Sequence, residues 1–164
     1  MASTDTDFDP FAGPAINKTV PTTEPQREMW AAMRFSQEVT LAYNESVTLT
    51  LLGSLEVQRL STAVNQVVAR HETLRATLSG DGLSLLISEP STVTLKVIDL
   101  SDLDSDMQRA SFDDLVHHDT STPFDLARGP LYRFKLAKLS ATEHRLVFTA
   151  HHIVCDGWST GVVL

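Results

Sequence analysis

Two alternating segments near the end of the chain, LYRFKLAKL at 131–139 and TEHRLVFTAHH at 142–152, constrain the fold most strongly. In the first segment Tyr132, Phe134 and Leu136 fall on one face, with cationic residues between them. Side chains alternate between the two faces of a β-strand, so both segments are typical of amphipathic strands. The residues SATE between them are typical of a turn. The pattern therefore predicts an antiparallel β-hairpin.

Helices and further strands are predicted along the rest of the chain. Thr23 suits the N-cap of a helix that continues towards Phe35, and Pro25 suits its first turn. Apolar residues at i, i+4, i+7 and i+8 from Leu60 predict a second helix at about 56–71. The other predicted elements are strands at 44–53, 73–79, 83–88 and 94–100 and a helix at about 102–119. This mixture predicts the α/β (α+β) class, with a mixed, mostly antiparallel sheet packed on helices.

The composition excludes several classes of protein. The 164 residues, 42% of them hydrophobic, suffice for one core. A net charge of −8 without a basic run argues against nucleic-acid binding, and no apolar run is long enough to span a membrane. Cys155 is the single cysteine, so no internal disulfide can form and a reducing cytoplasm is expected.

The two ends of the chain differ in character. The acidic, polar start MASTDTDFDP is unlike a secretory signal. Residues 1–20 show little periodicity, so we predict a tail or linker there, allowing a short extended piece around residues 15–20. Residues 21–164 are predicted to form the domain.

The segment TAHHIVCDGWST at 149–160 places two imidazoles and a carboxylate at the end of a predicted strand. If the strand geometry holds, His151 and His152 point to opposite faces, so one faces a core and the other a cleft. Gly157 would allow a sharp turn, and the carboxylate of Asp156 could then fold back to hold the loop. Residues from Trp158 onwards are expected to open another helix.

These residues allow three interpretations from their spacing alone. The histidines and Asp156 could be hydrogen-bonded structural groups, which is the commoner role of such side chains. A metal site is less favoured, because adjacent histidines on opposite faces are poor joint ligands and no further Cys/His cluster supports them. A general base at the strand end is the third interpretation. Cys155 is interpreted as a packing residue, because no cation or helix N-terminus is evident to activate its thiol.

Four segments, taken in order, resemble motifs of one known family. HHIVCDG at 151–157 matches the HHxxxDG signature of condensation domains of nonribosomal peptide synthetases. RHETLRATL at 70–78 resembles the RHExLRxxF stretch of that family, with Leu78 where phenylalanine is usual. TPFDLARGPLYR at 122–133 resembles its PFDLxxGPLxR segment, and TTEPQREMW at 22–30 is similar to its N-terminal motif around Gln and Trp.

The resemblance implies a fold and an activity. The family fold has two lobes like chloramphenicol acetyltransferase, with the active site in a tunnel between them. Residues 21–164 would be the N-terminal lobe of a condensation domain, with the C-terminal lobe absent, so the fragment is expected to be inactive alone. The implied reaction forms an amide between a donor acyl or peptidyl thioester and an aminoacyl thioester. Both substrates arrive on phosphopantetheine arms of carrier proteins, and the lobe itself is expected to bind no cofactor and no metal.

The resemblance also implies roles for individual residues. The second histidine of the signature, His152, would be the catalytic residue, acting as a base or positioning the amine. His151 and Gly157 would shape the loop as structural support. Asp156 would be structural and pair with an arginine, which could come from RHETLR, as Arg70 or Arg75, or from the absent lobe.

Two other functions stay open at this point. One is an O-acyltransferase of the same superfamily, using coenzyme A or a carrier, because such enzymes share the HxxxD pattern. The other is a non-catalytic lobe that docks carrier proteins. The expected partners are the upstream donor and downstream acceptor carrier proteins and the C-terminal lobe, without nucleic acid or membrane. An exposed inter-lobe face would also favour self-association of the fragment.

Overall fold

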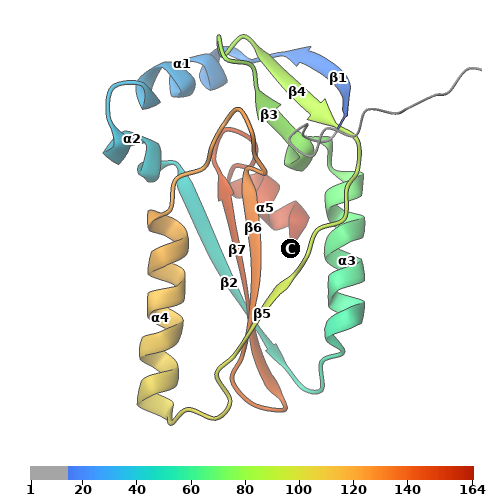
Figure 1. The fold of residues 1–164 in the computed structure, drawn as a ribbon, viewed down its shortest axis with the longest axis vertical. Helices are drawn as coiled ribbons and strands as arrows, with labels where there is room; N and C mark the ends of the chain where they lie inside the picture. The colour runs from blue at the N-terminus through green and yellow to red at the C-terminus, as the bar shows by residue number, and fades with distance from the viewer. Residues whose placement is uncertain (1–14) are drawn as a thin grey trace, which may run out of the picture.

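The computed structural model describes residues 15–164, so the first 14 residues of the tail predicted over 1–20 lie outside the described residues (Figure 1). The main sheet has four strands in the order β2-β7-β6-β5. These strands are β2 (Asn44–Leu52), β5 (Lys96–Asp99), β6 (Tyr132–Lys138) and β7 (Glu143–His151). Figure 1 shows α3 (Val57–Arg70) and α4 (Ser105–Ser121) on opposite sides of this sheet.

A smaller sheet and three short helices complete the fold. The smaller sheet has the order β1-β4-β3, formed by β1 (Ile16–Pro21), β3 (Ala76–Leu78) and β4 (Ser84–Ser88). It lies with α1 (Glu24–Met33) and α2 (Gln37–Ala42) at one end of the main sheet, and α5 (Gly157–Val163) follows β7 (Figure 1). None of the helices over residues 15–164 has the length and apolar character needed to cross a membrane.

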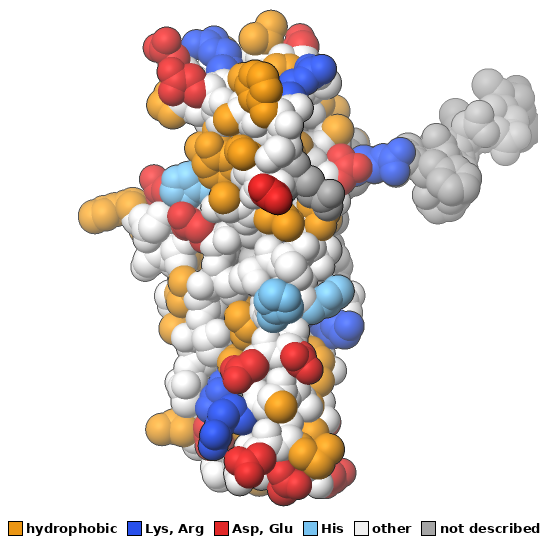
Figure 2. Space-filling model, turned by 90° about the vertical axis from the view of Figure 1, so that its left-hand side faces the viewer, with side chains coloured by type: hydrophobic (Ala, Val, Ile, Leu, Met, Phe, Trp, Pro, Cys, Tyr) orange, Lys and Arg blue, Asp and Glu red, His pale blue; other side chains and the backbone are white. Residues whose placement is uncertain are grey.

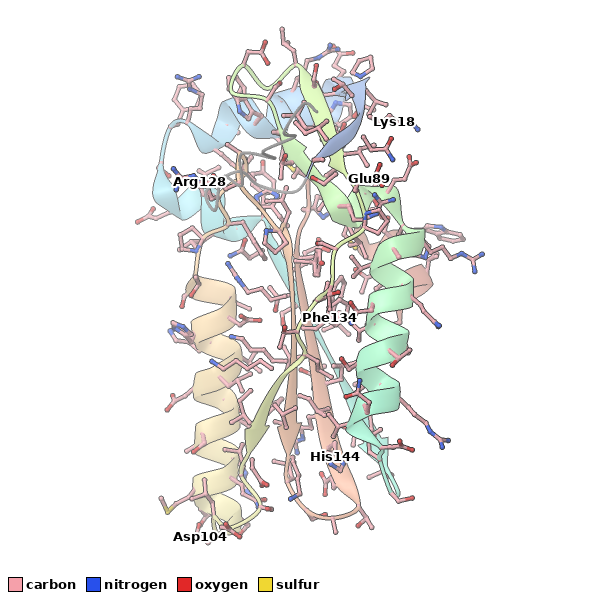
Figure 3. The ribbon with its side chains drawn as sticks, turned by 45° about the vertical axis from the view of Figure 1, so that its right-hand side comes forward. Lys18, Glu89, Asp104, Arg128, Phe134 and His144 are labelled. Carbon is pink, nitrogen blue, oxygen red and sulfur yellow. The ribbon has the colours of Figure 1, made fainter. Side chains whose placement is uncertain are left out.

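The predicted hairpin is confirmed as the centre of the main sheet. β6 and β7 pair antiparallel, with Phe134 opposite Phe148 and the two rings stacked at 4.7 Å between centroids. Figure 3 shows Phe134 in the middle of this sheet. β5 pairs parallel with β6, because the chain returns through α4 before it enters β6. The sheet is therefore mixed and mostly antiparallel, as the sequence predicted.

The alternation of the strands divides the apolar side chains between two cores. One core packs Phe134, Leu136 and Phe148 against α3, whose Val64 and Val68 are buried. The second core lies between the opposite face of the sheet and α4, and it contains Leu100, Phe112, Ala137, Leu139 and Val147. Each large side chain that is removed from water contributes about 1.5–3 kcal/mol to folding. Figure 2 shows the outer surface on the α4 side of the molecule, where acidic and histidine side chains gather.

The extended piece allowed around residues 15–20 is present as β1, which begins at Ile16 and pairs with β4. Two other elements needed correction. The strand predicted at 73–79 is reduced to β3, because a single 3-10 turn, η1 (Glu72–Arg75), redirects the chain after α3. Helix α2 was missed, although its N-cap residue Ser36 accepts a hydrogen bond from the Val39 N–H at 3.2 Å.

Candidate functional site

The candidate site is the turn that connects β7 to α5. β7 ends at His151, and residues 152–156 cross to the first residue of α5. The His152 N–H donates to the Tyr43 carbonyl at 2.8 Å, one step beyond the last paired residues of β2 and β7. The strand ends at His151 and the turn begins at His152, so the strand geometry assumed for both histidines holds only as far as His151.

His151 lies inside the lobe, with 0% of its surface exposed. Its ring Nδ1 accepts a hydrogen bond from the Ile153 N–H at 3.1 Å, and its main-chain N–H donates to the Leu131 carbonyl at 2.9 Å. The rings of Tyr43 and Phe124 lie about 6 Å from the His151 ring. Burial, with a smaller contribution from His152, lowers the pKa of His151 from 6.5 to about 4. His151 is therefore a neutral structural group near neutral pH, and the burial expected for one of the two histidines is confirmed.

His152 has the opposite surroundings. Its side chain is 34% exposed, and its Nδ1 lies 2.7 Å from Oε1 of Glu45 at the start of β2. Nδ1 is covered by protein atoms, although its contact with Glu45 does not have hydrogen-bond geometry. Nε2 is not covered in this way, and no described residue makes a hydrogen bond with it. Nε2 is therefore part of the exposed third of the ring.

Asp156 is the N-cap of α5 rather than one half of an ion pair. Its Oδ1 accepts hydrogen bonds from the Ser159 N–H at 2.8 Å and from the Ser159 hydroxyl at 2.6 Å. These hydrogen bonds lower the pKa of the Asp156 carboxyl. Within residues 15–164 its carboxylate makes no ion pair, so the pairing with Arg70 or Arg75 considered from the sequence is wrong for the described residues.

Neither arginine of RHETLR makes an ion pair with Asp156. Arg70 is exposed in the last turn of α3. Arg75 donates from Nη1 to the Ser88 carbonyl and lines a cavity of about 980 Å³, while its buried Nε has no partner among the described residues. None of the residues that line this cavity belongs to the turn after β7. This cavity and His152 are therefore separate features of the lobe.

The sequence suggested that Gly157 allows a sharp turn, but the backbone at this position does not require a glycine. It is the first residue of α5, its φ is not positive, and a Cβ there would meet no described atom within 4 Å. The turn after β7 therefore does not depend on a glycine conformation at this position. Cys155, next along the loop, is buried, and burial raises the pKa of its thiol, which agrees with its interpretation as a packing residue.

Two of the other recognised motifs meet at this turn, which the sequence alone did not reveal. Gln26 donates from Nε2 to the Ile153 carbonyl at 2.9 Å, and its Oε1 accepts from the Thr23 N–H in a capping box at the start of α1. Phe124 and Leu131, from the TPFDLARGPLYR segment, contact His151 through its ring and its main chain. The motif resemblance pointed to these segments without giving their contacts.

Glu45 was also missed, and no local pattern could have found it. It reaches His152 because β2 pairs with β7 in a register that places Glu45 opposite Ala150. Among the described residues, no three or more His, Cys, Asp or Glu side chains are grouped as metal ligands would be. The chemistry available at the turn is thus that of a partly exposed imidazole with a carboxylate behind it.

We expect Asp156→Ala to lower the melting temperature of the chain by about 2–4 °C, because α5 loses its N-cap. Asparagine also caps helices well, so Asp156→Asn should melt close to the parent. Thermal unfolding followed by circular dichroism measures both variants. Equal losses in the two variants would instead indicate that the charge of Asp156, and not its capping, stabilises the loop.

The fold and the turn together define an α/β lobe that presents one accessible histidine at the end of a central strand. A family model described as the condensation domain matches residues 16–164. The chain therefore belongs to the condensation domain family, which confirms the resemblance seen in its four motifs.

Relatives and solved structures agree with this family. Chondramide synthase cmdD of Chondromyces crocatus is 35% identical over 145 residues, covering 87% of this chain and 4% of that protein. Cyclosporin synthetase simA of Tolypocladium inflatum is 32% identical over 157 residues, covering 94% of this chain and 1% of that protein. The chain thus spans only a small part of the length of these relatives.

Among solved structures, a variant of the starter condensation domain of rhizomide synthetase RzmA has a TM-score of 0.79 at 26% identity. Tallysomycin biosynthesis protein TlmII has a TM-score of 0.78 at 26% identity. Each match covers 90% of this chain and 36% of the other chain. The predicted fold class is confirmed, and the chain spans about a third of the length of these structures.

Proposed function

We propose that this chain is the N-terminal lobe of a peptide-synthetase condensation domain that joins a donor acyl or peptidyl thioester to the amine of an acceptor aminoacyl thioester. The observation that carries the proposal is the accessible Nε2 of His152 in the HHxxxDG turn. Contacts from two of the other three motif segments support the turn. Family membership and the length of the match are consistent with a lobe of this kind.

The proposed reaction uses one histidine. The acceptor amine attacks the thioester carbonyl, a C–N bond forms, and the C–S bond breaks to release the donor thiol. An α-amino group has a pKa of about 8, so a fraction of it is free near neutral pH. Nε2 of His152 accepts the proton that the nitrogen loses, or orients its lone pair for attack, and the departing thiolate recovers a proton.

The neighbouring residues support this chemistry without taking part in it. His151 stays neutral and anchors the turn through the Ile153 N–H. Asp156 caps α5, the helix that follows the turn. We propose that Arg70, Arg75 and Gly157 take no direct part in the reaction, because Arg70 is exposed on α3, Arg75 donates a hydrogen bond to Ser88, and Gly157 has open space around it.

The proposed partners follow from the substrates. An upstream carrier protein would supply the donor thioester and a downstream carrier the acceptor, both on phosphopantetheine arms, and the lobe would bind no cofactor of its own. A second lobe would close the site, because Trp158 is 83% exposed and Val162 is also exposed on α5. The 164 residues alone are therefore proposed to be inactive. Location in the cytoplasm stays a prediction from the single cysteine, Cys155.

The experiment that tests this function uses a complete condensation domain carrying these residues, with separately loaded donor and acceptor carrier proteins. Mass spectrometry of the acceptor arm should show the amide-linked product. Transfer to hydroxyl acceptors and not to amines would instead support the O-acyltransferase. Binding of carriers by a well-folded domain, without any transfer, would support the docking module.

A further inference from the structure

We propose that Glu45 is a positioning residue for His152 that keeps the proton of the neutral ring on Nδ1 and leaves the lone pair on Nε2. The contact between the two side chains is an observation about this lobe. Its meaning for catalysis rests on the proposed function of His152. No motif of the sequence includes Glu45, and its place is set by strand pairing alone.

The two residues are held against each other by the same pair of strands. Glu45 is the second residue of β2 and lies opposite Ala150 in β7. Tyr43, just before β2, accepts the His152 N–H at 2.8 Å and so fixes the main chain of the histidine. A nine-residue ladder extends from this point along β2 and β7, which restricts relative movement of the two backbones.

The closeness of the two polar atoms assigns the tautomer. A neutral imidazole carries one N–H and one lone pair, whereas a carboxylate offers only lone pairs. Nδ1 of His152 and Oε1 of Glu45 lie 2.7 Å apart. If Nδ1 were unprotonated, a lone pair on each atom would face the other at this distance, and the contact would be repulsive. With the proton on Nδ1 the contact becomes attractive. The present angle is poor, but such hydrogen bonds often tighten only when substrate is bound.

No other group facing His152 competes for this role among the described residues. His151 is neutral, and its Nδ1 is taken by the Ile153 N–H. The Asp156 carboxylate is oriented by Ser159 and lies beyond ion-pair distance of His152. Glu45 is thus the carboxylate in contact with the ring, and its contact is with the covered nitrogen.

The consequence is that the accessible nitrogen is the one able to accept a proton. Nε2 carries the lone pair on the exposed part of the ring, where an acceptor amine would approach. Once Nε2 has taken the proton, both ring nitrogens are donors, and the Glu45 carboxylate lies next to the new positive charge. The carboxylate therefore favours the same ring orientation before and after proton transfer.

The test reads the tautomer directly, without turnover. In the 164-residue chain with ¹⁵N-labelled histidine, the ¹⁵N shifts of neutral His152 give the ratio of Nδ1–H to Nε2–H forms. We expect Nδ1–H to dominate in the parent, and Glu45→Val, which keeps a good strand residue, to lower the ratio about two- to fivefold. Glu89→Gln, an exposed control outside the turn, should leave the ratio unchanged. An unchanged ratio in Glu45→Val overturns the proposal.

A second measurement separates this inference from the proposed function. In a complete domain, Glu45→Val should lower kcat for peptide transfer about two- to fivefold with KM nearly constant, and Glu45→Gln should recover part of the loss because its amide oxygen still accepts a hydrogen bond. A shifted tautomer ratio with parental kcat overturns the positioning role. If His152→Ala also retains the parental rate, the proposed function itself fails, and the NMR result still stands for the contact.

Discussion

In a complete condensation domain, His152→Ala is expected to slow peptide transfer about 10²–10⁴-fold while the melting temperature stays close to that of the parent. A positioned general base typically contributes a factor of this size. The side chain is partly exposed, and its Nε2 makes no hydrogen bond with any described residue. Alanine retains the N–H that donates to Tyr43, so the turn keeps its main-chain support.

The matched variant is His151→Ala, because the two histidines are adjacent and differ mainly in burial. This substitution removes a fully buried ring and the acceptor for the Ile153 N–H, so its main effect should be on stability. Single-turnover transfer and melting curves for both variants separate the two roles. A stable His152→Ala enzyme at near-parental rate would contradict the assignment, and a folded but inactive His151→Ala enzyme would reverse it.

The second large effect concerns acid stability. The pKa of His151 is about 4 in the folded lobe and about 6.5 in the unfolded chain. His151 therefore lowers the free energy of unfolding only at a pH where its imidazole is protonated in the unfolded chain. Above pH 6.5 it is neutral in both states. As the pH falls from 6.5 to 4, the unfolded state gains a proton that the folded state does not, so the free energy of unfolding should fall by about 3 kcal/mol. Below pH 4 this contribution changes no further.

The control for this prediction is His151→Asn, which does not titrate and whose amide oxygen can replace Nδ1 as acceptor for the Ile153 N–H. Urea unfolding of both proteins at several pH values between 7 and 4 measures the effect. The parent should lose about 3 kcal/mol more than the variant over this range, whatever their stabilities at pH 7. Parallel losses would show that His151 is protonated as readily inside the lobe as outside it.

Much of the fold could be predicted because strong periodic patterns cover its centre. The alternation around Phe134 and the helical spacing from Leu60 each have one simple interpretation, and both elements are present. Shorter elements were harder to predict. Alternation over 73–79 could not distinguish a 3-10 turn followed by a three-residue strand from one continuous strand, and β1 depends on its pairing with β4.

The candidate site was predictable in its residues but not in its contacts. The HHxxxDG resemblance identified His152, and strand alternation anticipated that one of the two histidines would be buried. Spacing could not show that Asp156 would cap α5 through Ser159 instead of meeting an arginine. Glu45 lies far from His152 in the sequence, and only the register of β2 against β7 brings them together.

The β2–β7 ladder also determines where lobes of this kind can be recombined. A shift of one residue between paired strands turns every following side chain to the other face, so an insertion or deletion inside β2 or β7 would misplace the histidine turn relative to Glu45. A single junction in the loop from Gly53 to Glu56 would take β2 from one parent and β7 from the other, because the two strands lie on opposite sides of that loop in the sequence. An exchanged segment that runs from before Asn44 to beyond His152 keeps both strands, and with them the contact between Glu45 and His152, from one parent.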